Sequence, residues 1–306
     1  MNIDDKNFSE TDHNVLFVVV DSCRYDTAAA AHVPFLNSVG PLRMGEAPGT
    51  YTLPSHVSFF SGILPNIIDG NPFFFGSYSQ IWRSKNAREN HKIPLVEYAE
   101  ANIIDHYREL GHEVVGVGGV SFFSSQGDNL LPSLFPKFTH FEKPHGISKI
   151  ENIPRSDDQF PLANREKILK DLNLEKPFFL FINCPETHIP YDYPGMVATA
   201  EYVRAVKKMY ALDSIKHQHP ESGLTDNEKS LLLSAQRGAL EWVDSQLAEL
   251  MRMLENSRPT LVVVMGDHGE ELGEGGRYGH AHAHMQVLHV PLWCGITNLE
   301  RTQERK

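Results

Sequence analysis

Short, continuous runs of apolar residues recur at wide intervals along the chain. The four clearest are VLFVVV ending at Val20, EVVGVGGV ending at Val120, PFFLFINC ending at Cys184 and TLVVVMG ending at Gly266. Uninterrupted apolarity over so few residues is typical of strands that are buried on both faces of a parallel sheet. We therefore expect these runs to form the centre of one sheet.

Segments with apolar residues at helical spacing lie between these strands. Residues 94–110 carry such a period and end at Gly111, a typical helix stop. Thr225 and Glu228 have the spacing of a capping box ahead of a second long period. A strand follows each helix, and this alternation predicts an α/β fold with a doubly wound, mostly parallel central sheet and helices on both faces.

Two segments have no clear period. Residues 65–92 are rich in Asn, Gly, Ser and Phe, and residues 121–160 carry many Pro, Ser and Lys. Both patterns favour loops. Because no repeat or composition break divides the chain, we expect residues 1–306 to form a single domain with loop insertions near these two segments.

Side chains that bind metals follow three of the predicted strands. Asp21 ends the first, Asp267 and His268 end the last, and His188 comes shortly after the PFFLFINC strand. Because the carboxyl ends of parallel strands share one edge of the sheet, these side chains should lie close together. An adjacent Asp and His can offer an oxygen and an imidazole to the same ion, which suits Zn or Mn.

Thr52 opens a helix-like stretch in TYTLPSHVSFFSG. A helix N-terminus supplies free backbone N–H groups and positive potential, which favour both an alkoxide and a bound phosphate. This position suits a nucleophile, although a threonine there can also serve only as a helix cap.

Three histidines alternate in the segment GHAHAH. If this segment is extended, His280, His282 and His284 share one face, and one or two of them can reach a metal. His188 could likewise be an ordinary loop histidine. We expect Arg24 and Asp26 to form a structural pair beneath the site rather than to bind a substrate.

Charge and cysteine content restrict the partners and the compartment. With 39 acidic and 28 basic side chains, the net charge of -11 argues against nucleic acid, whereas a bound metal would still allow a small anion. Three cysteines do not suggest a disulfide framework. We find neither an export signal nor an apolar run long enough to span a membrane, and we expect a cytoplasmic protein, with homo-oligomerisation left open.

The four blocks VVVDSCRYD, TLPSHVSFFSG, CPETHIPY and VVVMGDHGEELGE, with HVPLW further on, resemble in order the core motifs of the alkaline phosphatase and sulfatase superfamily. The resemblance implies a divalent metal, Mn or Zn ahead of Mg or Ca. The metal ligands that it implies are Asp21, Thr52, Asp267 and His268. It also implies that Thr52 is the nucleophile and that His188 and His280 are catalytic, while a second metal or substrate role stays open for His188, His280 and His282.

Three departures from the sulfatase pattern refine this expectation. Thr52 stands where sulfatases need the cysteine or serine that becomes formylglycine, His56 replaces an arginine, and Ser22 replaces the second of two aspartates. The remaining set resembles threonine-dependent phosphodiesterases and phospholipid head-group transferases. The resemblance thus implies hydrolysis of a small phosphate mono- or diester through a phospho-threonine. The alternatives are a head-group transferase, a sulfatase-like hydrolase and a non-catalytic binding protein of the same fold.

Overall fold

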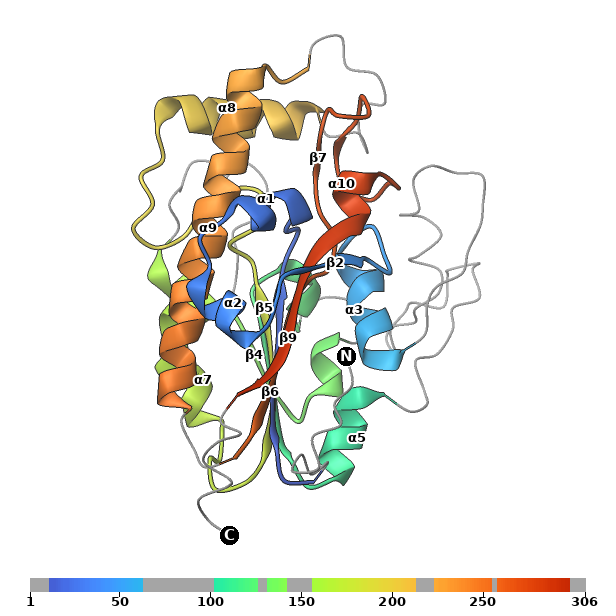
Figure 1. Ribbon diagram of the computed structural model, residues 1–306, viewed down its shortest axis with the longest axis vertical. Coiled ribbons are helices and arrows are strands. Elements are labelled where there is room, and N and C mark those ends of the chain that lie inside the picture. Colours follow the sequence, from blue (N-terminus) through green and yellow to red (C-terminus); the bar gives the residue numbers. More distant parts are fainter. Residues whose placement is uncertain are drawn as a thin grey trace.

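The computed structural model describes residues 11–62, 102–125, 131–141, 156–212, 223–254 and 258–297 (Figure 1). A seven-stranded sheet with the order β2-β9-β6-β1-β5-β3-β4 forms its centre. The strands are β1 (Asn14–Val20), β2 (Arg43–Glu46), β3 (Glu113–Gly118), β4 (Lys137–His140), β5 (Phe178–Cys184), β6 (Thr260–Gly266) and β9 (His289–Thr297). The five strands from β6 to β4 are parallel, whereas β9 runs antiparallel to β6 and β2 antiparallel to β9. The predicted mostly parallel sheet and its four apolar strands are confirmed.

The strand register aligns the carboxyl ends of the three central strands. Val20, the last residue of β1, lies opposite Cys184 of β5 on one side and Gly266 of β6 on the other. Residues that follow these three strands therefore emerge at the same point of one sheet edge.

Helices cover both faces of the sheet, as the sequence predicts (Figure 1). One face carries α1 (Tyr25–Ala30), α2 (Pro34–Val39), α7 (Arg165–Lys170) and the long α9 (Asp226–Met253), and the other carries α3 (Thr52–Ser61) and α5 (Ile103–Glu109). Alternate residues of β1 pack into the two cores, Leu16 and Val18 into the first and Phe17 and Val19 into the second. This alternation explains why the strand is apolar throughout.

A third apolar cluster lies beyond the carboxyl ends of the central strands. It joins α8 (Ala200–Leu212), the beginning of α9 and the hairpin of β7 (Glu271–Leu272) and β8 (Tyr278–Gly279). Ile189 and Tyr191, from the loop after β5, are buried in the same cluster. Figure 1 shows α8 and β7 at the end of the molecule toward which β1 and β6 point. This cluster thus supports the loops that emerge from the sheet edge.

The expectation of loops is only partly met. Within residues 121–160, residues 137–140 form the edge strand β4, which pairs with β3. Short helical turns are η1 (Ser121–Phe123), η2 (Leu131–Leu134), η3 (Asp157–Gln159), η4 (Pro161–Asn164) and, near the end of the chain, α10 (Met285–Leu288). Residues 65–92 lie outside the described residues. The helix expected over residues 94–110 is described only from residue 102, where α5 is followed by Gly111 with φ +88°.

Two further observations concern the helices and the cysteines. Among the described residues, no helix has both the length and the apolarity that crossing a bilayer requires. Cys23, Cys184 and Cys294 form no disulfide, and burial raises the pKa of all three thiols.

The predicted capping box at the start of α9 is present. The Thr225 hydroxyl accepts from the Glu228 N–H at 3.3 Å, and the Glu228 carboxylate accepts from the Thr225 N–H at 2.7 Å. Losing this cap should cost about 1 kcal/mol, so Thr225→Ala is expected to lower the urea midpoint of unfolding. Ser230→Ala, at an exposed position in the same helix, is the matched control and should change stability by less than about 0.5 kcal/mol. Equal midpoints for Thr225→Ala and wild type would contradict the role of the cap.

Candidate metal centre

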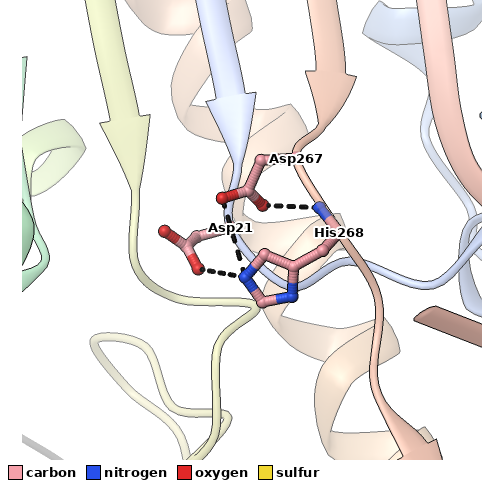
Figure 2. Close-up of side chains that lie close together, drawn as sticks. All are labelled: Asp21, Asp267 and His268. Carbon is pink, nitrogen blue, oxygen red and sulfur yellow. Dashed lines mark hydrogen bonds and ion pairs between the residues drawn. The ribbon is translucent and has the colours of Figure 1, made fainter. Parts of the chain in front are cut away.

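Asp21 and the Asp267-His268 pair meet at the carboxyl ends of β1 and β6. All three side chains are fully buried. Their ligand atoms lie within 4.8 Å of one another, and His268 Nε2 is 3.7 Å from both Asp21 Oδ1 and Asp267 Oδ2. Figure 2 shows the two carboxylates and the imidazole pointing toward one another. Three of the sequence-predicted metal ligands are therefore brought together.

Hydrogen bonds fix the outward atoms of these side chains. Asp267 Oδ1 accepts from the N–H groups of Ser22 and His268, both at 3.0 Å. Asn183 donates to Asp21 Oδ2 at 2.9 Å. The His268 Nδ1–H donates to the Gly269 carbonyl at 2.9 Å, which leaves the lone pair on Nε2. Such outer contacts are those that orient ligands around a metal.

The inward atoms of Asp267 and His268 lack such partners. Asp267 Oδ2 and His268 Nε2 are buried and make no hydrogen bond within the part of the chain that the structure describes. Buried polar atoms are nearly always satisfied, so a convergent pair of this kind indicates a ligand. A divalent cation fits two carboxylates and one imidazole, and this mixed oxygen and nitrogen set suits Zn or Mn.

Burial sets the protonation of the same groups. It raises the pKa of Asp267, and the charge of Asp21 raises it further. It also holds the pKa of His268 well below the usual range, so the imidazole is neutral and ready to bind a metal at neutral pH. A bound cation would stabilise both carboxylates in their charged form.

Thr52 is the first residue of α3, and the chain around it is tied to the site. The Ser55 hydroxyl donates to the Asp267 carbonyl at 2.7 Å, and the Ala281 N–H donates to the Thr50 carbonyl at 2.7 Å. The Thr52 turn is thus held between the end of β6 and the loop that carries His280. Tyr51, not Thr52, occupies the N-cap position, and its side chain makes no capping hydrogen bond. The interpretation of Thr52 as only a cap is therefore wrong.

His188 and His280 lie beside His268. The His280 ring centroid is 4.5 Å from that of His268 and 5.4 Å from that of His188. His280 Nδ1 is 3.2 Å from the buried carboxylate of Glu270, which holds the ring in place. The side chain of His280 is 23% exposed, whereas Asp21, Asp267 and His268 are fully buried, so solvent reaches His280 but not these three side chains.

The other two histidines of GHAHAH turn toward Glu271 instead. Ala281 adopts φ +67°, which breaks the extended conformation that the alternation suggested. His282 Nε2 lies 2.7 Å from a Glu271 oxygen, and His284 Nδ1 lies 3.6 Å from the same atom. The condition of an extended segment is therefore not met, so the three histidines do not share one face, and the structure does not bring His282 to Asp21, Asp267 and His268. Its role as a second metal or substrate residue stays a prediction without geometric support.

Residues to which the sequence analysis assigns no role complete the surroundings. Ser22 has φ +59°, a left-handed conformation that is uncommon outside glycine, and its hydroxyl donates to Glu270 at 2.7 Å. Gln236 of α9 donates to the Ser22 carbonyl at 2.9 Å and to the Thr187 carbonyl at 3.0 Å. Asn183, which donates to Asp21, could have been found from the sequence, because it is a polar residue inside an apolar strand.

The Arg24–Asp26 pair forms as expected. The Arg24 guanidinium donates twice to Asp26, at 2.8 and 2.6 Å, and also to Glu274 at 2.6 Å and the Glu270 carbonyl at 3.0 Å. Arg24 is the only buried lysine or arginine among the residues described. Its charge is thus already neutralised by two carboxylates of the protein.

The lowered pKa of His56 predicts how the stability of the protein depends on pH. Burial lowers its pKa from 6.5 to about 4. Below pH 6.5 the unfolded chain therefore binds a proton that the folded protein does not, and stability falls as the pH drops toward 4, by about 3 kcal/mol in total. Urea unfolding in chelator should show a shallower loss over this range for His56→Asn than for wild type. The raised pKa of Asp267 changes stability with pH in the opposite direction, so the quantity to measure is the difference in unfolding free energy between wild type and His56→Asn. If the two proteins lost stability in parallel as the pH falls, the lowered pKa of His56 would be contradicted.

Comparisons with known proteins agree with this geometry. The model of the family described as Sulfatase matches residues 13–292. Similar solved structures include the lipooligosaccharide phosphoethanolamine transferase EptA from Neisseria meningitidis, with 18% identity, a TM-score of 0.60, and coverage of 97% of this chain and 50% of that one. A phosphonate monoester hydrolase from Agrobacterium radiobacter is 16% identical, with a TM-score of 0.58 and coverage of 92% of this chain and 68% of that one. The C-terminal periplasmic domain of the phosphoethanolamine transferase EptC from Campylobacter jejuni is 16% identical. Its TM-score is 0.54, and the match covers 94% of this chain and 80% of that one.

A search of curated protein sequences finds no match. At identities below 20%, the solved structures establish a shared fold, while the family model spans nearly the whole chain. The chain therefore belongs to the sulfatase family, within the alkaline phosphatase and sulfatase superfamily.

Proposed function

We propose that the protein is a metal-dependent phosphoric ester hydrolase that acts through a phospho-threonine at Thr52. The observation that carries this proposal is the convergence of Asp21, Asp267 and His268 on one point beside the first turn of α3. Members of the family include enzymes that act on phosphoesters and sulfate esters, and the intact ligand set argues against a non-catalytic binding protein.

The residues present divide the reaction between them. Asp21, Asp267 and His268, with the Thr52 hydroxyl, would hold a divalent ion, which when bound supplies positive charge and lowers the pKa of a hydroxyl. Thr52 Oγ1 gives up its proton to solvent as it attacks phosphorus, and the bond from phosphorus to the leaving oxygen breaks. His280 or His188 delivers a proton to that oxygen. Water then displaces the threonine oxygen from phosphorus and restores the hydroxyl.

The backbone of α3 supports the same reaction. The first N–H groups of a helix have no partner within the helix. At the start of α3 the side chain of the N-cap residue, Tyr51, makes no capping hydrogen bond. These groups are therefore suited to bind phosphoryl oxygens beside Thr52.

Charge favours a diester over a monoester. The described site offers no free guanidinium, because Arg24 is bound to carboxylates and His56, at the place of the sulfatase arginine, is neutral with a pKa of about 4. A phosphate monoester carries nearly two charges at neutral pH, whereas a diester carries one. We therefore favour a small, singly charged phosphodiester as the substrate.

Transfer to a second alcohol in place of water is the second candidate. It is supported by similar structures of transferases, which include the Streptococcus pyogenes phosphoglycerol transferase GacH in complex with sn-glycerol-1-phosphate, at 15% identity and a TM-score of 0.52. Sulfate ester hydrolysis is less favoured, since Thr52 is not a precursor of formylglycine.

Metal identity and compartment are also proposals. We favour Zn or Mn, and a similar structure, the periplasmic domain of EptC from Escherichia coli, is a complex with Zn, at 14% identity and a TM-score of 0.55. The unpaired cysteines support our proposal of a cytoplasmic location, whereas the similarity to periplasmic domains of EptC favours the periplasm.

The proposal is tested by reconstitution. Protein stripped with chelator is supplied with Mn, Zn, Mg or Ca and assayed with p-nitrophenyl phosphate, bis-p-nitrophenyl phosphate and p-nitrophenyl sulfate. We expect metal-dependent turnover that is fastest on the bis ester and absent on the sulfate. Adding glycerol or ethanolamine then separates hydrolysis from transfer through the products formed. No turnover of either phosphoester with any of the metals would favour a non-catalytic binding protein instead.

A further inference from the structure

His56 is a buried histidine to which the proposed reaction gives no role. It lies one helical turn after Thr52 in α3 and is completely shielded from solvent. Four phenyl rings surround it, with centroids 5.1 to 6.1 Å from that of the imidazole, and they belong to Phe59, Phe60, Phe123 and Phe181. A polar ring among phenyl groups is costly unless its nitrogens are used.

One of its nitrogens reaches both the nucleophile turn and a metal ligand. His56 Nδ1 lies 2.7 Å from the Thr52 carbonyl and 3.6 Å from Asp267 Oδ2. Because a carbonyl only accepts, the proton must be on Nδ1, and this N–H donates to Thr52. The distance to Asp267 is too long for a hydrogen bond, but it brings the carboxylate oxygen close to the positive end of the N–H dipole.

The preceding residue reinforces this arrangement. The Ser55 hydroxyl donates to the Asp267 carbonyl at 2.7 Å. Adjacent residues of α3 thus contact the main chain and the side chain of Asp267, and one of them also binds the residue that carries the nucleophile. The two contacts relate the Thr52 turn to the end of β6 directly, without passing through a metal.

We infer that His56 is a positioning residue, which holds the Thr52 turn at a fixed distance from Asp267. The four phenyl rings keep the imidazole in one orientation, so the N–H points steadily at the Thr52 carbonyl. Misplacing a reacting group by about 1 Å can lower a rate about 100-fold, so a residue that never touches the substrate can still control turnover. This inference rests on the proposed function of Thr52.

Two substitutions separate positioning from packing. His56→Phe keeps an aromatic ring among the four phenyl groups and removes the N–H donor. His56→Asn keeps a donor at about the distance of Nδ1 from the backbone and removes most of the ring. If His56 positions Thr52, the Phe variant should lose kcat by about 10- to 100-fold and the Asn variant should retain more activity. If the ring only packs, this order should reverse.

The experiment compares kcat, KM, metal stoichiometry and melting temperature on bis-p-nitrophenyl phosphate with the metal that best supports the wild type. We expect the Phe variant to lose kcat while its metal content and melting temperature stay near wild type. His112→Phe is the matched control. His112, just before β3, is also buried, and its Nε2 lies 2.9 Å from the main-chain carbonyl of His13. This control should keep the wild-type kcat.

The outcomes distinguish this inference from the proposed function. An active wild type whose His56→Phe variant has an unchanged kcat would overturn the positioning role alone. Equal loss in the Phe and Asn variants would overturn it too, because the donor would then make no difference. A wild type without phosphoester turnover would instead overturn the proposed function.

Discussion

Thr52→Ala should abolish turnover, with a loss of at least about 1000-fold, because the proposed reaction has no other nucleophile. Metal should remain bound nearly at the wild-type stoichiometry. Asp21, Asp267 and His268 supply the ligand atoms that lie within 4.8 Å of one another, and the substitution leaves all three in place. Steady-state assays on bis-p-nitrophenyl phosphate and metal analysis of the dialysed protein measure the two quantities.

Thr52→Ser is the matched control for this variant. It keeps a hydroxyl at the first residue of α3, so it should retain a measurable part of the wild-type rate. Equal activity of Thr52→Ala and wild type would remove the covalent step from the proposal. Loss of metal from Thr52→Ala would show that the threonine is needed mainly as a ligand.

Asp267→Asn is expected to lose metal and activity together. Asp267 Oδ2 faces the other two ligands without a hydrogen bond among the described residues, while Oδ1 is held by two N–H groups. An amide removes one negative charge from the set and binds a divalent cation much more weakly. We expect metal affinity to fall by more than about 100-fold, since even outer contacts of metal ligands change it by 10- to 100-fold. Calorimetric titration with Mn or Zn measures the change.

Asp244→Asn controls for the replacement of a buried aspartate. Asp244 lies in α9, and its carboxylate accepts from the Leu36 N–H at 2.8 Å and the Phe35 N–H at 3.3 Å, at the start of α2. Its replacement should lower stability and leave metal affinity and kcat near wild type. Wild-type metal affinity in Asp267→Asn would contradict the assigned site.

The central strands could be predicted because burial on both faces makes them apolar throughout, as in β1 and β5. The edge strands β2 and β4 could not, because each has only four residues, which are partly or fully exposed and mostly polar. The helix α8 did have a usable signal, since Tyr202, Val206 and Met209 recur at helical spacing and are buried. The sequence analysis assigns no element to these residues.

The convergence of the candidate metal ligands was predictable for a related reason. Strand register aligns Val20 with Gly266, so the residues that follow must meet, and their sequence neighbours identify them. The role of Ser22 was not predictable, because its left-handed conformation and its bond to Glu270 depend on the folded chain. The orientation of His282 was not predictable for a similar reason, since alternation in sequence could not reveal the turn at Ala281.

The account depends most on one ion held by four side chains. A crystal grown with Mn or Zn and vanadate, measured at the absorption edge of the metal, tests this directly. We expect one strong anomalous peak, about 2.0 to 2.3 Å from an oxygen of Asp21, an oxygen of Asp267, Nε2 of His268 and Oγ1 of Thr52. A peak elsewhere, or a Thr52 hydroxyl that points away from the other three, would contradict the account.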